Sequence, residues 1–103
     1  MQTTVTARHC EISAELTERA RGVMERVGQY SPHALDASVV FDRIADGAQA
    51  EIRLHVRGGQ VLVATAAESD HRTALDRAED KIRRQLEKTV TQAKRGRRPA
   101  ANP

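Results

Sequence analysis

The chain has 103 residues, of which 39% are hydrophobic and 30% are charged. This length is typical of one domain, and the composition fits a folded protein rather than a disordered one. No apolar run is long enough to cross a bilayer, the N-terminus lacks the core of a signal peptide, and Cys10 is the single cysteine. We therefore expect a cytoplasmic protein without an internal disulfide.

The net charge of +3 is unevenly distributed along the chain. Residues 1–68 carry seven Lys/Arg and nine Asp/Glu, whereas residues 69–103 carry ten and five. A basic C-terminal third favours an acidic polymer as partner, most often nucleic acid. Surface lysines that serve only solubility are the simpler alternative.

The first part of the chain predicts a strand, a helix and a second strand. Residues 2–8, QTTVTAR, are rich in β-branched residues and predict a strand. A helix is expected to begin at Ser13 as N-cap, with Glu15 in its first turn, and to end before Pro32. Its apolar positions, at helical spacing, are Leu16, Ala20, Val23, Val27 and Tyr30. Residues 36–43 predict the second strand.

The second part predicts a hairpin and a long helix. After a turn at Asp46-Gly47, the segment AEIRLHVR alternates between apolar and polar residues. Ala50, Ile52, Leu54 and Val56 then share one face, and Glu51, Arg53, His55 and Arg57 the other. Gly58-Gly59 predicts a hairpin turn that leads into a strand over residues 60–68. Ser69 or Asp70 is expected to cap a helix that ends near Ala93.

The order β-α-β-β-β-α predicts an α+β fold, a two-layer sandwich with two helices on one face of a four-stranded sheet. We expect a right-handed crossover followed by an antiparallel meander. Residues 1–93 would form the domain, and residues 94–103 a basic flexible tail. The predicted core includes Leu16, Val23, Ile52, Leu54, Val56, Ile82 and Leu86.

The segment DRAEDKIRRQLEK, residues 76–88, combines an apolar stripe and a basic stripe on one predicted helix. The apolar stripe consists of Leu75, Ala78, Ile82 and Leu86. The basic stripe, placed on the far side of the helix, consists of Arg77, Lys81, Arg84 and Lys88. For Asp76, Asp80 and Glu87 we expect ion pairs within the helix.

The sequence offers no set of residues that indicates catalysis. Its four histidines lack metal-ligand spacing, and no serine lies in a nucleophile-elbow motif. We therefore expect no enzyme, no cofactor, no metal and no small-molecule substrate. Because Tyr30 and Phe41 are the only aromatic residues and both are expected in the core, stacking on RNA bases is disfavoured. The remaining mode of RNA binding is recognition of the backbone of folded RNA by arginine and lysine.

The segment RGGQVLVATAAESDHRTALDRAEDKIRRQLEK resembles the signature of ribosome hibernation-promoting factors, also called ribosome-associated translation inhibitors. Glu68-Ser69-Asp70 matches the family's acidic-Ser-Asp triplet. The helix motif is matched by Asp80, Lys81, Ile82, Arg84, Gln85, Leu86 and Lys88. The opening TARHCEIS is similar to the family's first strand and helix start, so the resemblance extends from about residue 1 to 94.

The resemblance implies the fold already derived, and docking on small-subunit ribosomal RNA in the channel for messenger and transfer RNA. There the protein would hold ribosomes idle under stress. Lys81, Arg84 and Lys88 would contact the RNA, with Arg8 as a further candidate; Arg77 is added from the helical wheel alone. Away from the ribosome we expect a monomer. The chain resembles a short form, sigma-54 modulation protein-like.

One residue departs from the family pattern, and one alternative function is kept. Arg72 occupies a position where the family commonly has an aromatic residue. The alternative function is a protein–protein regulatory module, such as a modulator of a transcription factor, that binds through the open face of the sheet.

Overall fold

The computed structural model describes the backbone of residues 1–97 and the side chains of residues 1–88. Its elements, in chain order, are β1 (Gln2–Arg8), α1 (Ala14–Tyr30), β2 (Ala34–Ile44), β3 (Gly47–Val56), β4 (Val61–Glu68) and α2 (His71–Arg97). The predicted order β-α-β-β-β-α is confirmed. Helix α2 ends later than expected, so the predicted tail begins with helical residues; residues 98–103 lie outside the described part.

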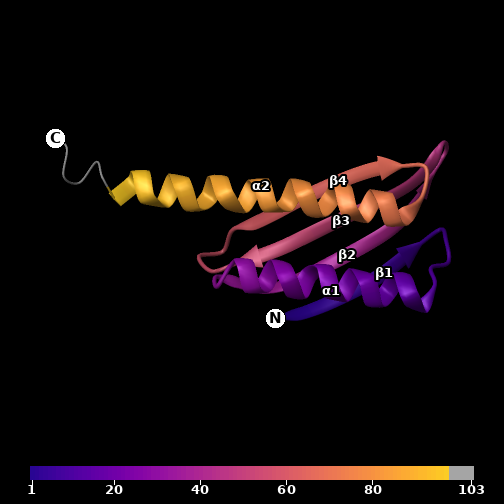
Figure 1. Cartoon of the computed structure of the whole chain (residues 1–103), viewed down its shortest axis with the longest axis horizontal. Helices are drawn as coiled ribbons and strands as arrows, with labels where there is room; N and C mark the ends of the chain where they lie inside the picture. Colours follow the sequence, from indigo (N-terminus) through magenta and orange to yellow (C-terminus); the bar gives the residue numbers. More distant parts are fainter. Residues whose placement is uncertain (98–103) are drawn as a thin grey trace.

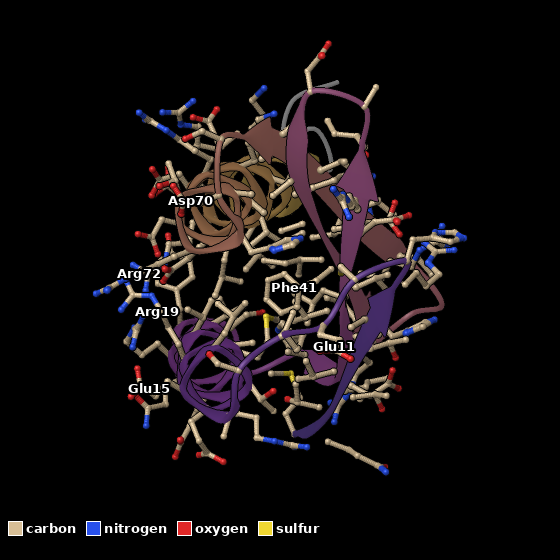
Figure 2. The ribbon with its side chains drawn as sticks, turned by 90° about the vertical axis from the view of Figure 1, so that its right-hand side faces the viewer. Glu11, Glu15, Arg19, Phe41, Asp70 and Arg72 are labelled. Atoms are coloured by element: carbon tan, nitrogen blue, oxygen red, sulfur yellow. The ribbon has the colours of Figure 1, made fainter. Side chains whose placement is uncertain are left out.

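The four strands form one sheet in the order β1-β2-β3-β4. Strand β1 runs parallel to β2, and the other two pairs are antiparallel. The parallel pair requires the crossover that α1 supplies, and short turns suffice for the meander. Both helices lie on one face of the sheet (Figure 1), and Figure 2 shows them side by side in the end-on view. The two-layer α+β fold is therefore confirmed.

The core lies between the sheet and the helices. Alternate residues of the strands point into it, as the pattern of β3 predicts, with Ala50, Ile52 and Leu54 fully buried. The helices contribute apolar stripes that include Val23, Met24, Val27, Leu75, Ile82 and Leu86. Leu16 is only partly buried and packs against this core rather than lying within it.

The prediction that Tyr30 lies in the core is wrong, because 47% of the residue is exposed. Tyr30 is the last residue of α1, and the chain leaves the helix after it through Ser31 and Pro32. Partial burial and the neighbouring Glu87 carboxylate of α2 raise the pKa of Tyr30. Phe41, by contrast, is fully buried as predicted.

The helix starts follow the sequence signals. The Ser13 hydroxyl accepts a hydrogen bond from the Leu16 amide (3.0 Å). The Asp70 carboxylate accepts one from the Thr73 amide (2.8 Å), so Asp70 rather than Ser69 is the cap of α2. These hydrogen bonds also lower the pKa of Asp70. Figure 1 shows that both helices begin at the same end of the molecule.

Candidate nucleic-acid interface

The four cations predicted on α2 are all exposed and gather on one flank of the helix; we call Arg77, Lys81, Arg84 and Lys88 the basic flank. This flank faces the β4 edge of the sheet instead of pointing directly away from the core. Two contacts fix its orientation. The Lys81 ammonium donates to the Thr65 carbonyl (2.7 Å), and the Gln85 amide donates to the Val63 carbonyl (2.7 Å).

These contacts have a structural cause. Strand β4 is at the edge of the sheet, so carbonyl groups on its outer side lack a neighbouring strand. Lys81 and Gln85 are four residues apart and therefore reach two such carbonyls from one side of α2. Lys81 thus anchors the helix to the sheet edge. The sequence signal that was overlooked is this polar pair beside the apolar stripe of a helix that follows an edge strand.

Arg77, Arg84 and Lys88 differ from Lys81, because they form no hydrogen bond or ion pair with any residue that the structure describes. Their charges are available to an external anion. A helix rises about 1.5 Å per residue, so the row from Arg77 to Lys88 is about 16 Å long. A row of this length can contact more than one phosphate group.

The opposite flank of α2 is neutralised by α1. The Arg19 guanidinium donates two hydrogen bonds to the Asp76 carboxylate (3.0 and 3.2 Å). Glu79 pairs with Arg26 of α1 (3.6 Å) and with Arg83 of its own helix (3.0 Å). The expected ion pair within the helix is therefore wrong for Asp76, which the packing of α1 against α2 brings to Arg19.

The other two acidic residues near the basic flank also lack the expected pairs. Asp80 is exposed and forms no ion pair with the described residues, and Glu87 lies beside Tyr30. Carboxylates of α2 are thus drawn mainly towards α1, whereas cations accumulate on the β4 side. Acidic and basic residues alternate along the sequence of α2, but the packing of the two helices places them on different flanks.

Arg8 does not belong to the basic flank. It lies on β1, at the opposite edge of the sheet, and its Nε is 3.9 Å from the Asp42 carboxylate. His9 contacts the same carboxylate at 3.0 Å. Hydrogen bonds from His9 and from the Arg43 amide hold the pKa of Asp42 below its ordinary value.

Two of the basic side chains on the open face of the sheet are already paired with carboxylates. Arg53 contacts Glu51 (2.9 Å), and His55 contacts Asp36 (2.8 Å). Arg53 and His55 point to solvent as predicted, but each is matched by a carboxylate. Because Phe41 is the only aromatic residue in the strands and is buried, this face offers no stacking platform. It is a weaker candidate for nucleic acid than the basic flank.

The surroundings of Arg72, His71 and Cys10 could not be predicted from the sequence. Arg72 is exposed and borders a cavity of about 350 Å³ between the first turns of the helices (Figure 2). The His71 imidazole, which the sequence did not single out, lies 2.8 Å from the Asp42 carbonyl and packs edge-on against Phe41. Cys10 is partly buried and has no disulfide partner.

Neither a metal cluster nor a membrane-spanning helix is present among the described residues. No group of three or more His, Cys, Asp or Glu side chains is placed there to hold a metal ion. No helix within the same residues is both long enough and apolar enough to cross a membrane.

Comparison with known proteins places this arrangement in context. The family model described as "Sigma 54 modulation protein / S30EA ribosomal protein" matches residues 3–94. No match was found among curated proteins. Among solved structures, a ribosomal subunit interface protein from Coxiella burnetii has a TM-score of 0.81 at 19% identity, covering 88% of this chain and 99% of that one. At that identity the likeness shows the fold alone.

The N-terminal domain of Protein Y from Thermus thermophilus is also similar. It has a TM-score of 0.75 at 26% identity, and the match covers 86% of this chain and 99% of that domain. The family model extends over nearly the whole sequence and includes all four strands of the sheet apart from Gln2. The chain therefore belongs to the sigma 54 modulation protein/S30EA ribosomal protein family.

Proposed function

We propose that the protein binds ribosomes, docks on small-subunit ribosomal RNA in the channel for messenger and transfer RNA, and keeps ribosomes idle under stress. The observation that carries this proposal is the basic flank of α2, where three exposed cations have no partner among the described residues. Family membership supports a ribosomal partner, since the family model that matches residues 3–94 is described by the S30EA ribosomal protein.

The basic flank is suited to phosphates rather than to bases. Each arginine or lysine that neutralises a phosphate releases condensed counterions, which favours binding without sequence specificity. Base recognition in single-stranded RNA would call for exposed aromatic rings. The strands provide none, and the exposed Tyr30 lies at the end of α1. Recognition by shape and charge is the mode that this surface supports.

The protein would act by occlusion and would not turn over a substrate. Inhibition of translation should then reach its maximum near one protein per ribosome. It should weaken when transfer RNA or messenger RNA already occupies the channel. A titration of a reconstituted translation reaction measures both effects. Inactivation of excess ribosomes by a trace of protein would contradict occlusion and indicate an enzyme.

The site itself is tested with the double variant Arg84→Glu/Lys88→Glu. These residues are chosen because reversal of Lys81 would also break its contact with β4. Cosedimentation with ribosomes over a salt series should show weaker binding. The log–log salt slope should be smaller in magnitude by about 1.4 to 1.8, from about 0.7 to 0.9 per lost phosphate contact.

The matched control is Arg43→Glu/Arg57→Glu. Both residues are exposed, and their side chains form no hydrogen bond or ion pair with the described residues. The double variant therefore changes the net charge by the same amount and leaves the basic flank intact. Equal loss of binding in both double variants would show that net charge, not this helix flank, determines binding.

The alternative function, a protein-binding module that uses the open sheet face, predicts the reverse pattern. Val63 is 39% exposed on that face. Val63→Glu would then abolish partner binding, whereas the Arg84→Glu/Lys88→Glu variant would retain it. Pull-down experiments with both variants separate the two functions.

A further inference from the structure

The two edges of the sheet are protected to different degrees. On β4, the outer carbonyls of Val63 and Thr65 accept hydrogen bonds from α2 side chains. On β1, one side chain approaches the edge, where the Arg21 guanidinium donates to the Thr3 carbonyl (3.2 Å). An edge with unpaired amide and carbonyl groups is a template for another strand.

The strand registers show which groups of β1 face outward. Val63 and Thr65 direct their carbonyls away from β3, so the residues between them in β4 form the hydrogen bonds to β3. The same alternation of inward and outward backbone groups continues through β3 and β2. In β1 it leaves Thr3, Val5 and Ala7 with their amides and carbonyls directed outward. The bond from Arg21 to the Thr3 carbonyl agrees with this assignment. It is the only partner that the described residues provide for these groups.

Strand β1 also lacks the features that usually block an edge. Residues 1–7, MQTTVTA, contain no charged side chain and no proline, and the register with β2 is regular throughout. Natural edge strands commonly carry lysine, proline or a bulge that prevents pairing. Arg8, at the end of the strand, is the first charged residue.

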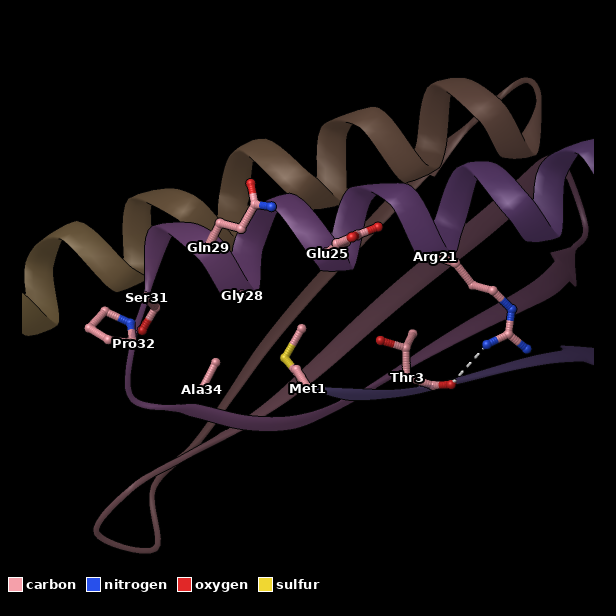
Figure 3. Close-up of a pocket in the computed structure, with 9 residues that line it drawn as sticks. All are labelled: Met1, Thr3, Arg21, Glu25, Gly28, Gln29, Ser31, Pro32 and Ala34. Carbon is pink, nitrogen blue, oxygen red and sulfur yellow. Dashed lines mark hydrogen bonds between the residues drawn. The ribbon is translucent and has the colours of Figure 1, made fainter.

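The shape beside β1 is suited to an antiparallel copy of itself. In Figure 1, β1 and α1 cross, so that the strand lies outside the helix at its N-terminal end and inside it at the other end. The uncovered end borders a cavity of about 530 Å³ that is lined by Met1, Thr3, Gly28 and Pro32, among others (Figure 3). A two-fold axis through the middle of β1 would place the uncovered half of each strand beneath the overhanging α1 of the other copy.

We propose that β1 pairs antiparallel with β1 of a second copy, joining two four-stranded sheets into one. With Val5 opposite Val5, Thr3 of one copy lies opposite Ala7 of the other. All of these residues direct their amides and carbonyls outward, so this register is self-complementary and forms hydrogen bonds along the whole strand. Thr4 then faces Thr6 on the open side of the sheet, a pairing without charge repulsion.

A second copy fits this edge better than an unrelated peptide does, because its α1 would also cover the exposed end of β1 and the cavity of about 530 Å³ there, which a lone strand would leave open. The dimer revises the expectation of a monomer away from the ribosome. It is independent of the proposed function, since the basic flank lies beside β4 at the other edge.

The test is analytical ultracentrifugation of the full chain from about 10 µM to about 1 mM, a range suited to a small interface. The weight-average mass should rise from 11.4 kDa towards twice that value. Over the same range, hydrogen exchange measured by NMR should slow at the Val5 and Ala7 amides. The Thr4 and Thr6 amides, which face β2, should not change.

Thr4→Lys/Thr6→Lys places like charges opposite each other across the axis and should weaken association about tenfold or more. Val63→Lys/Thr65→Lys adds the same charge to the same face of β4 and should leave association unchanged. Circular dichroism verifies that both variants fold. A mass that stays at the monomer value, unchanged exchange at Val5, or equal weakening by both variants would overturn the proposal.

Discussion

Three leucines allow the packing of α2 against the sheet to be measured. Leu75 is fully buried, Leu86 is 2% exposed and Leu35 is 52% exposed. Replacement of a buried leucine by alanine costs about 2–5 kcal/mol of unfolding free energy, depending on how far the cavity can collapse. Leu86 is the last described core residue of α2, and the C-terminal part of this helix extends past the sheet (Figure 1). We expect Leu86→Ala near the lower end of that range and Leu75→Ala higher.

Leu35→Ala is the control and should change the unfolding free energy by less than about 0.5 kcal/mol. For a chain of this size each kcal/mol lowers the melting temperature by about 4 °C, so the Leu75 variant should melt about 8–20 °C lower. Urea denaturation followed by circular dichroism gives the free energies. A cost below about 1 kcal/mol for Leu86→Ala would mean that the buried face of α2 is assigned incorrectly.

Two further predictions concern a turn and a helix cap. A Cβ atom at Gly47 would clash with the Glu68 carbonyl oxygen, so Gly47→Ala should destabilise the fold by about 1–3 kcal/mol in urea denaturation. Gly22→Ala, at an uncrowded helix position, should instead stabilise it by about 0.5–1 kcal/mol; destabilisation there as well would contradict the steric explanation. The lowered pKa of Asp70 means that its ionised form contributes stability above the unfolded pKa near 3.8, and that this contribution is lost as the pH falls through the folded value. Asp70→Asn, which keeps a capping side chain, should therefore show a smaller loss of stability below about pH 4 than the wild type, and identical pH profiles would rule out Asp70 as the source.

Much of the fold is encoded locally and could be predicted. The alternation from Ala50 to Val56 defines the buried face of β3 because side chains of a strand point to opposite faces in turn. Ser13 and Asp70 mark the helix starts because their side chains accept hydrogen bonds from the first turn. The helical spacing likewise identified Ile82 and Leu86 as core residues.

The candidate site depended on the sequence for its residues and on the tertiary structure for their surroundings. A helical wheel identifies the cations of the basic flank, but it does not specify which neighbours approach each flank. Packing of α1 matched Asp76 with Arg19, and the edge position of β4 engaged Lys81. Arg77, Arg84 and Lys88 are left as the cations of the basic flank that have no partner among the described residues.

The sequence by itself determined the order of the elements, their buried faces and their caps, since these follow from periodicity and from hydrogen bonds within a few residues. Only the tertiary structure decided which strands form the edges, where α1 meets α2, and that Tyr30 lies outside the core. Those outcomes depend on contacts between residues far apart in the chain. No local pattern records such contacts, because their energies arise only when the helices and the sheet pack together.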